Sequence, residues 1–432
     1  MKLDKMRTIL VGLAFLSISA FWQLYDGIIP LMLKNTFHVN DALSGAIMAL
    51  DNVLALFMLP LFGMLSDKTH SRLGRRTPYI LFGTVTAVAC MLLLPIADNA
   101  RSLPLFVVGL FLVLISMSTY RSPAVALMPD VTPKPLRSKG NAVINLMGTV
   151  GGMLTLLLIG ALVPKTDTPS YLLLFAVVAV IMAVAVGVLF ATVREPKLVE
   201  KRKREYPDEL ESDIPETADH PKGKESLLPK DIKRSLLLLL SSVALWFMGY
   251  NAVTTAFSKY VQIQWKLAGG DFAYLMLIAT GAAIVSYIPV GIAASKIGRK
   301  KSILIGVALL ACCFGGAAFF PTYHILAIPL FALVGVAWAA INVNSYPMVV
   351  EMCRGSDIGK FTGYYYTFSM AAQIVTPILS GALLEYIGYW TLFPYAALCV
   401  AAAFVTMQFV RHGDSRPAPA PNKLDAYESL DS

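Results

Sequence analysis

Residues 171–193 read YLLLFAVVAVIMAVAVGVLFATV, a run that contains no charged side chain. A helix rises about 1.5 Å per residue, so about 20 apolar residues cross the hydrocarbon core of a bilayer, which is about 30 Å thick. Inside that core the backbone has to satisfy its own hydrogen bonds, which leaves only helices and closed barrels as spanning structures. A continuous apolar run of this length predicts a transmembrane helix.

The rest of the chain repeats this pattern, since 56% of all residues are hydrophobic and only 15% are charged. Including the run above, we expect spans at residues 8–33, 41–66, 77–97, 103–128, 139–163, 171–193, 235–260, 271–295, 301–320, 324–350, 358–384 and 390–410. The sequence therefore predicts an all-α membrane protein with twelve transmembrane helices.

The connections between these stretches alternate in charge. One set of loops holds only Lys34, Arg101, Lys165 and Lys266, whereas about 30 of the 36 basic residues fall in the other set and in the two tails. Because basic loops stay inside, we expect a multi-pass protein of the plasma membrane with both termini in the cytoplasm. The net charge of +9 follows from this topology, and bases that are not gathered on one soluble face argue against nucleic acid binding.

The apolar pattern stops at residues 194–234, which are dense in charges of both signs and contain several prolines. A segment of this composition buries too little apolar surface to fold, so we expect a mobile cytoplasmic linker. It separates two six-helix bundles, 1–193 and 235–411. We expect the tail at 412–432, with its PAPAP stretch, to be disordered.

The two halves resemble each other at the end of their second span. The first half reads GMLSDK at 63–68 and LGRR at 73–76, and the second half reads GIAASKIGRK at 291–300. An internal repeat of two six-span units is typical of a transporter with its binding site between the halves, near the middle of the bilayer.

These residues resemble the signature loop of the major facilitator superfamily, Gly-x-x-x-Asp-(Arg/Lys)-x-Gly-Arg-(Arg/Lys). The first copy contains an insertion at 69–72 and continues as GRRTPYI, which resembles the glycoside–pentoside–hexuronide:cation symporters and the related sucrose–proton symporters. The segment 121–130, RSPAVALMPD, is similar to the sucrose branch as well. The second copy has Ser295 where an acid would stand, so we expect the full charge network only in the first half.

The resemblance implies that this loop forms a gate on the cytoplasmic side. We expect Asp67 to pair with Arg75 or Arg76 and to face the positive N-terminus of a neighbouring helix. Gly63 would allow helices to approach closely, and Gly74 completes the motif. The alternative is that these charges only set the topology.

Three ionised residues are expected well inside the spans, where a charge costs about 2.5–3.5 kcal/mol on insertion scales. Asp26 shares a helix face with Trp22, an arrangement that suits a sugar because the indole covers C–H groups while the carboxylate accepts from hydroxyl groups. Asp51 lies near the centre of its span and is a candidate for binding a proton or another cation. The resemblance implies that Asp26 and Asp51 carry the coupling ion.

Arg121, which follows Tyr120, would donate to sugar hydroxyl groups or neutralise Asp51. For each of these charges a structural interpretation stays open: Asp26 and Arg121 reaching toward the membrane surface, and Asp51 bonding a neighbouring helix. The second half offers polar side chains in place of charges, and any one of them could instead join helices. Its candidates are Tyr250, Asn251, Asn342, Tyr365 and Gln373, with Asn145 of the first half and Lys259 as weaker ones.

Together these features predict a secondary transporter that works by alternating access. No Gly-x-x-x-x-Gly-Lys-Ser/Thr loop for ATP is present, so an ion gradient has to supply the energy. We expect symport of a sugar or small glycoside with H+ or Na+ by a monomer, without a cofactor, a metal or a catalytic site. The alternatives are a uniporter, a drug:proton antiporter, or a membrane sensor that binds its solute without moving it.

Overall fold

A computed structural model describes residues 4–133, 136–166, 169–205, 229–352 and 358–414. Twelve helices in this part of the chain are long and apolar enough to cross a membrane, and the described residues contain no strand. The predicted all-α fold with twelve spans is confirmed.

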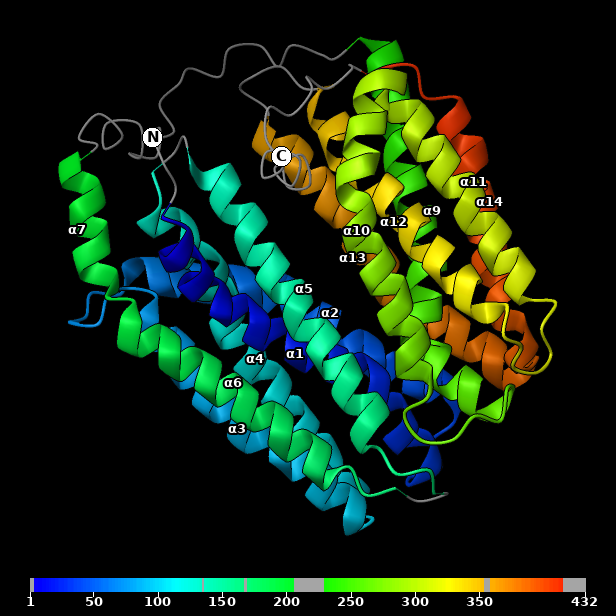
Figure 1. The fold of residues 1–432 in the computed structure, drawn as a ribbon, viewed down its shortest axis with the longest axis horizontal. Helices are drawn as coiled ribbons and strands as arrows, with labels where there is room; N and C mark the ends of the chain where they lie inside the picture. The colour runs from blue at the N-terminus through cyan, green and yellow to red at the C-terminus, as the bar shows by residue number, and fades with distance from the viewer. Residues whose placement is uncertain (1–3, 134–135, 167–168, 206–228, 353–357, 415–432) are drawn as a thin grey trace.

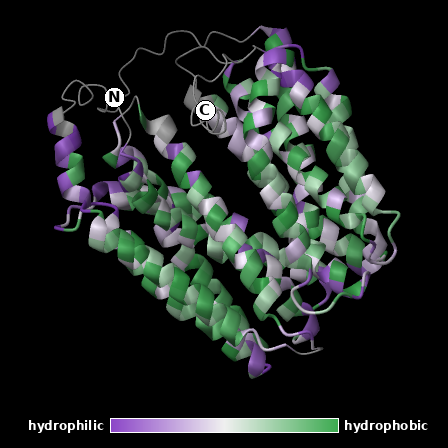
Figure 2. Ribbon diagram, viewed as in Figure 1, coloured by the Kyte–Doolittle hydropathy of each residue, from purple (hydrophilic) through white to green (hydrophobic). Residues whose placement is uncertain are grey.

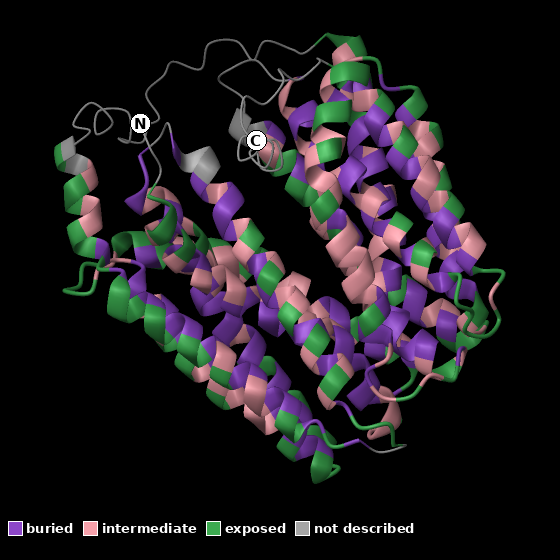
Figure 3. Cartoon of the chain, viewed as in Figure 1, coloured by how far each residue is buried: buried purple, intermediate pink, exposed green. Residues whose placement is uncertain are grey.

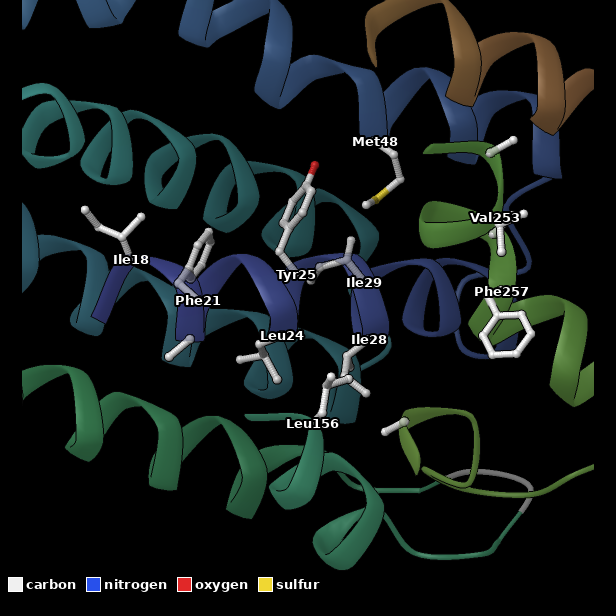
Figure 4. Packing of buried hydrophobic residues seen from close by; sticks show 14 of the residues in the cluster. Ile18, Phe21, Leu24, Tyr25, Ile28, Ile29, Met48, Leu156, Val253 and Phe257 are labelled. Atoms are coloured by element: carbon white, nitrogen blue, oxygen red, sulfur yellow. The ribbon is translucent and has the colours of Figure 1, made fainter. Parts of the chain in front are cut away.

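The first half is a bundle of six long helices. They are α1 (Lys5–Asn35), α2 (Asp41–Lys68), α3 (Thr77–Asn99), α4 (Leu103–Val131), α5 (Arg137–Leu162) and α6 (Leu172–Thr192). Helix α1 supplies much of the core, since Phe21, Leu24 and Ile28 are almost completely buried. Figure 4 shows Leu156 of α5 beside Ile28. This burial explains why α1 is apolar along most of its length.

The second half contains another six long helices and one short 3-10 helix. They are α9 (Lys230–Ile263), α10 (Phe272–Ile297), α11 (Arg299–Ala317), α12 (Ala327–Val350), α13 (Ile358–Tyr386), η2 (Tyr389–Thr391) and α14 (Leu392–Gln408). Aromatic residues fill the core here: Phe257 packs on Phe331, with ring centroids 4.7 Å apart. Helix α9 begins at Lys230, five residues before the expected start of this half.

The halves stand side by side and touch mainly where α2 packs on α13, α5 on α10 and α1 on α9. Because the number of spans is even, α1 begins and α14 ends at the same end of the molecule (Figure 1). We call this the terminal end and the other one the opposite end.

The outer faces of the helices are apolar, and polar residues gather at the two ends (Figure 2). Many residues on these faces are exposed (Figure 3), among them Leu173, Val180 and Val184 of α6. Apolar side chains that are exposed over the length of a spanning helix are suited to contact with lipid.

The expected linker differs from the prediction in its first part, because residues Glu195–Glu205 form helix α7. This helix contacts the end of α4, and Leu198 and Val199 pack against the core while Glu195 is buried. Two apolar residues and one buried acid therefore anchor a helix that composition alone did not predict. Residues 206–228 of the expected linker and 415–432 of the expected disordered tail lie outside the described residues.

Candidate functional site

The three ionisable residues predicted inside the spans line one cavity of about 250 Å³ at the contact between the halves. Helices α1, α2 and α4 provide Asp26, Asp51 and Arg121, and α9 and α13 close it from the other half. The full lining is Trp22, Asp26, Met48, Asp51, Asn52, Arg121, Asn251, Thr254, Thr255, Gln373 and Pro377. We call this space the small cavity. Its charged groups face a shared space, while their roles in binding stay predictions.

The partners of these charges leave donors and acceptors free for a solute. The guanidinium of Arg121 lies over the ring of Trp22, 5.4 Å from the centroid, and Asp51 accepts a hydrogen bond of 2.8 Å from Asn52. Trp22 Nε1 and Asn251 Nδ2 are buried without a hydrogen-bond partner in the described structure. Buried donors of this kind are costly unless something bonds them, and a bound solute would do so.

A second cavity of about 500 Å³ adjoins the small one and shares Trp22 and Asp26 with it. We call it the large cavity. It is lined by Phe15, Ser19, Trp22, Gln23, Asp26, Ala142, Asn145, Leu146, Gly148, Thr149, Gly152, Thr280, Ile284, Tyr287 and Asn342. Asp26 is the one ionisable carboxylate in this lining, and the remaining polar groups are hydroxyls, amides and the indole N–H of Trp22. Such a lining suits a neutral, polar solute.

Seven of the predicted binding or coupling residues line these cavities. Six lie around the small cavity: Trp22, Asp26, Asp51, Arg121, Asn251 and Gln373. Asn342 lines the large cavity.

Three predicted tyrosines line neither of these cavities in this structure, and their contact with a solute stays a prediction. The hydroxyl of Tyr120 is 3.3 Å from Ser17 Oγ, between α4 and α1. That of Tyr365 is 3.0 Å from Ser345 Oγ, between α13 and α12. Tyr250 stacks on Trp338 with ring centroids 3.7 Å apart. All three therefore join helices.

Sequence reasoning missed most of the large cavity. On α1, Phe15, Ser19, Trp22 and Asp26 follow one another at intervals of three and four residues, which places them on one helix face, with Gln23 beside Trp22. This spacing around the recognised pair Trp22 and Asp26 was a usable signal. Asn145, which received little weight, lies on the facing stripe of α5.

At the terminal end, the predicted gate forms a charged cluster inside the first half. Arg76 pairs with Asp67, as expected, and its Nε also donates to Asp130 at 2.8 Å. Arg75 pairs with Asp130 at 2.5 Å, in place of Asp67. Partial burial lowers the pKa of the Arg75 guanidinium, but its bonds to Asp130 outweigh this effect and the net pKa is raised, so Arg75 stays ionised. Gly63 lies close to α4, since a Cβ there would be 3.0 Å from Ser122 Oγ.

The N-terminus of α3 is capped by Glu195, a residue that sequence reasoning assigned only to the linker. Its carboxylate accepts from the backbone N–H groups of Arg75, Arg76 and Thr77 at 2.8–3.1 Å, and from the Thr77 hydroxyl at 2.7 Å. Gly74, with φ of +108°, leads the chain into this turn. A buried carboxylate bonded to free N–H groups stabilises a helix start. Asp67 instead bonds the side chain of Arg76, the residue just before α3.

At the opposite end, polar contacts join the two halves. Asp41, the first residue of α2, accepts from Lys259 Nζ of α9 at 2.9 Å, from the Tyr389 hydroxyl at 2.6 Å and from Lys34 at 3.0 Å. Its backbone N–H donates to Glu385 of α13 at 2.7 Å. We call these five residues the Asp41 cluster. Lys259, a weak candidate from the sequence, is only 3% exposed and belongs to this contact.

Further contacts surround this cluster. Asn35 donates to Gln262 at 3.0 Å, and Lys165 pairs with Asp271 at 2.7 Å. Helices α2 and α13 approach so closely that a Cβ at Gly45 would overlap the carbonyl of Pro377. The opposite end is therefore closed by packing as well as by charge.

Comparison with known proteins places the chain among membrane transporters. The sequence profile of the Major Facilitator Superfamily matches residues 11–343 and 264–429. Sucrose transport protein SUC3 of Arabidopsis thaliana is 28% identical over 138 residues, which are 28% of this chain and 23% of that protein. The MFS-type transporter ppzB of Metarhizium rileyi is 27% identical over 121 residues, which are 28% of this chain and 25% of that protein. The aligned segments thus span about a quarter of these relatives.

Solved structures share the fold over almost the whole chain. The xylose transporter XylE from E. coli, in an inward open conformation, has a TM-score of 0.65 and 16% identity and covers 99% of this chain and 98% of its own. A bacterial homologue of the iron transporter ferroportin, in an inward-facing state, has a TM-score of 0.68 and 12% identity, with coverage of 95% and 100%. Identities this low establish the fold alone.

Proposed function

The chain belongs to the major facilitator superfamily and is a transporter, not an enzyme, and from this premise we propose that it moves a sugar or small glycoside together with H+ or Na+. The transport cycle is alternating access, in which the cavities open first to one side of the membrane and then to the other. No cofactor takes part, because the ion gradient supplies the energy.

The lining of the large cavity carries the proposal for the solute. Its hydroxyls and amides can bond sugar hydroxyl groups without imposing charge, and Trp22 offers a flat apolar face. Its volume falls within the range of about 300–1,000 Å³ that small-molecule sites usually have. The aligned segment of the sucrose transport protein and the GRRTPYI and RSPAVALMPD segments support the same solute class.

Asp26 and Asp51 are the proposed cation sites. A carboxylate in a polar cavity inside the membrane can bind a proton or Na+ on one side and release it on the other. Asp26 lines both cavities, so a change in its charge would alter its electrostatic interaction with a solute in the large cavity and with Arg121 in the small one. One charge that crosses about 100 mV contributes about 2.3 kcal/mol, enough for roughly fifty-fold accumulation of a neutral solute.

The two ends of the molecule support alternating access. The Asp41 cluster seals the opposite end, whereas the charged cluster of the terminal end stays within the first half. With the basic loops in the cytoplasm of a plasma membrane protein, this state would present its cavities to the cytoplasm. One chain contains both halves around the cavities, so the proposed working unit is a monomer.

The deciding experiment is uptake by the purified full-length chain in proteoliposomes, with imposed proton or sodium gradients and a panel of labelled sugars. We expect gradient-dependent accumulation of at least one sugar. Sugar uptake that does not depend on the gradient and is unchanged in Asp51→Asn would indicate a uniporter. Transport of lipophilic cations without sugar uptake would indicate a drug:proton antiporter, and sugar binding without uptake a sensor.

A further inference from the structure

The glycines of α5 fall into two groups according to what surrounds them. A Cβ at Gly151 would overlap the carbonyl of Leu16 on α1, and one at Gly148 would be 2.9 Å from Ser19 Oγ. These two glycines are needed for the close packing of α5 on α1. At Gly152 the nearest atom is Gln23 Oε1, 3.7 Å from the Cβ position, which is an ordinary contact distance. Packing therefore does not require a glycine at residue 152.

The free space beside Gly152 belongs to the large cavity. Gly152 and Gln23 both line that cavity, as do Trp22, which directly precedes Gln23, and Asp26, one turn further along α1. A side chain at residue 152 would therefore occupy volume that a solute can otherwise use. Because protein interiors are close-packed, space left open next to polar groups is a feature that a ligand can fill.

We propose that the space over Gly152 receives the second ring of a two-ring glycoside, so that this glycine sets the size of solute that the protein accepts. The first ring lies between Trp22 and Asp26, and the second lies against Gln23, whose amide can both donate to and accept from hydroxyl groups. The large cavity, at about 500 Å³, has more volume than one six-membered ring fills. This inference rests on the proposed sugar transport and adds the size of the sugar.

The test compares Gly152→Leu with Gly187→Leu in the reconstituted full-length chain. Gly187 is exposed on α6 and has no atom within 4 Å of its Cβ position, so it receives the same side chain outside the cavities. We expect Gly152→Leu to weaken uptake of two-ring glycosides about tenfold or more and to change uptake of single-ring sugars by less than about threefold. Gly187→Leu is expected to leave both unchanged.

A second measurement checks the position itself without any transported solute. In a chain whose five native cysteines are replaced, Gly152→Cys should react with a water-soluble thiol reagent, and reagents of increasing size should react more slowly. Gly187→Cys should not react with this reagent, because Gly187 lies on the outer face of α6, which is suited to contact with lipid and not with water. Failure of Gly152→Cys to react would overturn the inference whatever the protein transports.

The outcomes separate the two proposals. If the wild-type chain takes up sugars but Gly152→Leu reduces two-ring and single-ring uptake equally, or neither, the size assignment is wrong and sugar transport stands. If the wild-type chain takes up no sugar under any gradient, the proposed function is wrong, and the ring assignment falls with it.

Discussion

The two ends of this transporter are held by opposite kinds of contact. At the terminal end, Arg76 connects Asp67 and Asp130 within the first half. At the opposite end, Lys259 of the second half reaches Asp41 of the first. Contacts within a half move with it as a rigid body, whereas contacts between halves have to break when the halves separate. Only the second kind therefore contributes directly to the balance between conformational states.

The largest effect is expected between the ends, at Arg121. Arg121→Ala removes the guanidinium that lies over Trp22 in the small cavity, and solute uptake in proteoliposomes should fall to background. Arg101 is exposed and lies just beyond the last residue of α3, at the opposite end of the molecule. Arg101→Ala should therefore leave uptake intact. Uptake at the wild-type level by a normally inserted Arg121→Ala protein would remove this residue from the site.

The next largest effect is expected at the opposite end. Asp41→Ala leaves Lys259 buried without its main counter-charge, and breaking a buried pair in this way costs about 3–5 kcal/mol. This cost falls on the closed state of the opposite end. The Gly152→Cys reporter should therefore react faster with an impermeant thiol reagent that is applied from that side.

A double variant provides the control for this prediction. Asp41→Asn combined with Lys259→Met removes both charges, and it should react more slowly than Asp41→Ala does. If Asp41→Ala leaves the rate of thiol labelling unchanged from both sides, the Asp41 cluster does not stabilise the closed state of the opposite end.

A smaller effect, and of another kind, is expected at the terminal end. Arg76→Ala removes hydrogen bonds to Asp130 and Ser66, each worth about 1.5–3 kcal/mol when a charged group is involved. Loss of these bonds should lower the temperature at which the protein begins to unfold. Because the bonds stay within the first half, thiol labelling of the Gly152→Cys reporter from either side should change little. Arg72→Ala, at an exposed arginine of the same loop, is the control. If Arg76→Ala changes the rate of thiol labelling from one side but leaves the unfolding temperature unchanged, the proposed difference between the two ends is wrong.

The smallest effect is expected for Lys165→Met. The pair of Lys165 and Asp271 also joins the halves, but the Lys165 side chain is 62% exposed. Exposed pairs contribute about 0–1 kcal/mol, so labelling from the opposite side should rise less than twofold or not at all. An effect as large as that of Asp41→Ala would show that burial does not distinguish the two pairs.

The spans and the pairing of Asp67 with Arg76 could be predicted because their signals are local. Hydrophobic runs and a short motif contain all the necessary information. The contact between Asp41 and Lys259 joins residues 218 positions apart, and that between Glu195 and Arg76 joins residues 119 apart. No local pattern reports such contacts, because they depend on how separate helices pack.

The tyrosines show where sequence reasoning could have been sharper. Tyr120 precedes Arg121, and Tyr250 precedes Asn251, and adjacent residues of a helix point in different directions. Assigning Arg121 and Asn251 to the cavity therefore does not place their neighbours there, although adjacent residues such as Trp22 and Gln23 can line one cavity together. The structure agrees, since Tyr120 meets Ser17 and Tyr250 stacks on Trp338.

The close crossing of α2 and α13 at Gly45 and Pro377 has a practical consequence. Since there is no room for even a methyl group between the two backbones, Gly45→Ala would act as a wedge that keeps the halves apart at the opposite end. A single added carbon would then favour the conformer that is open at the opposite end, for crystallography or cryo-microscopy, without any inhibitor, antibody or cross-link.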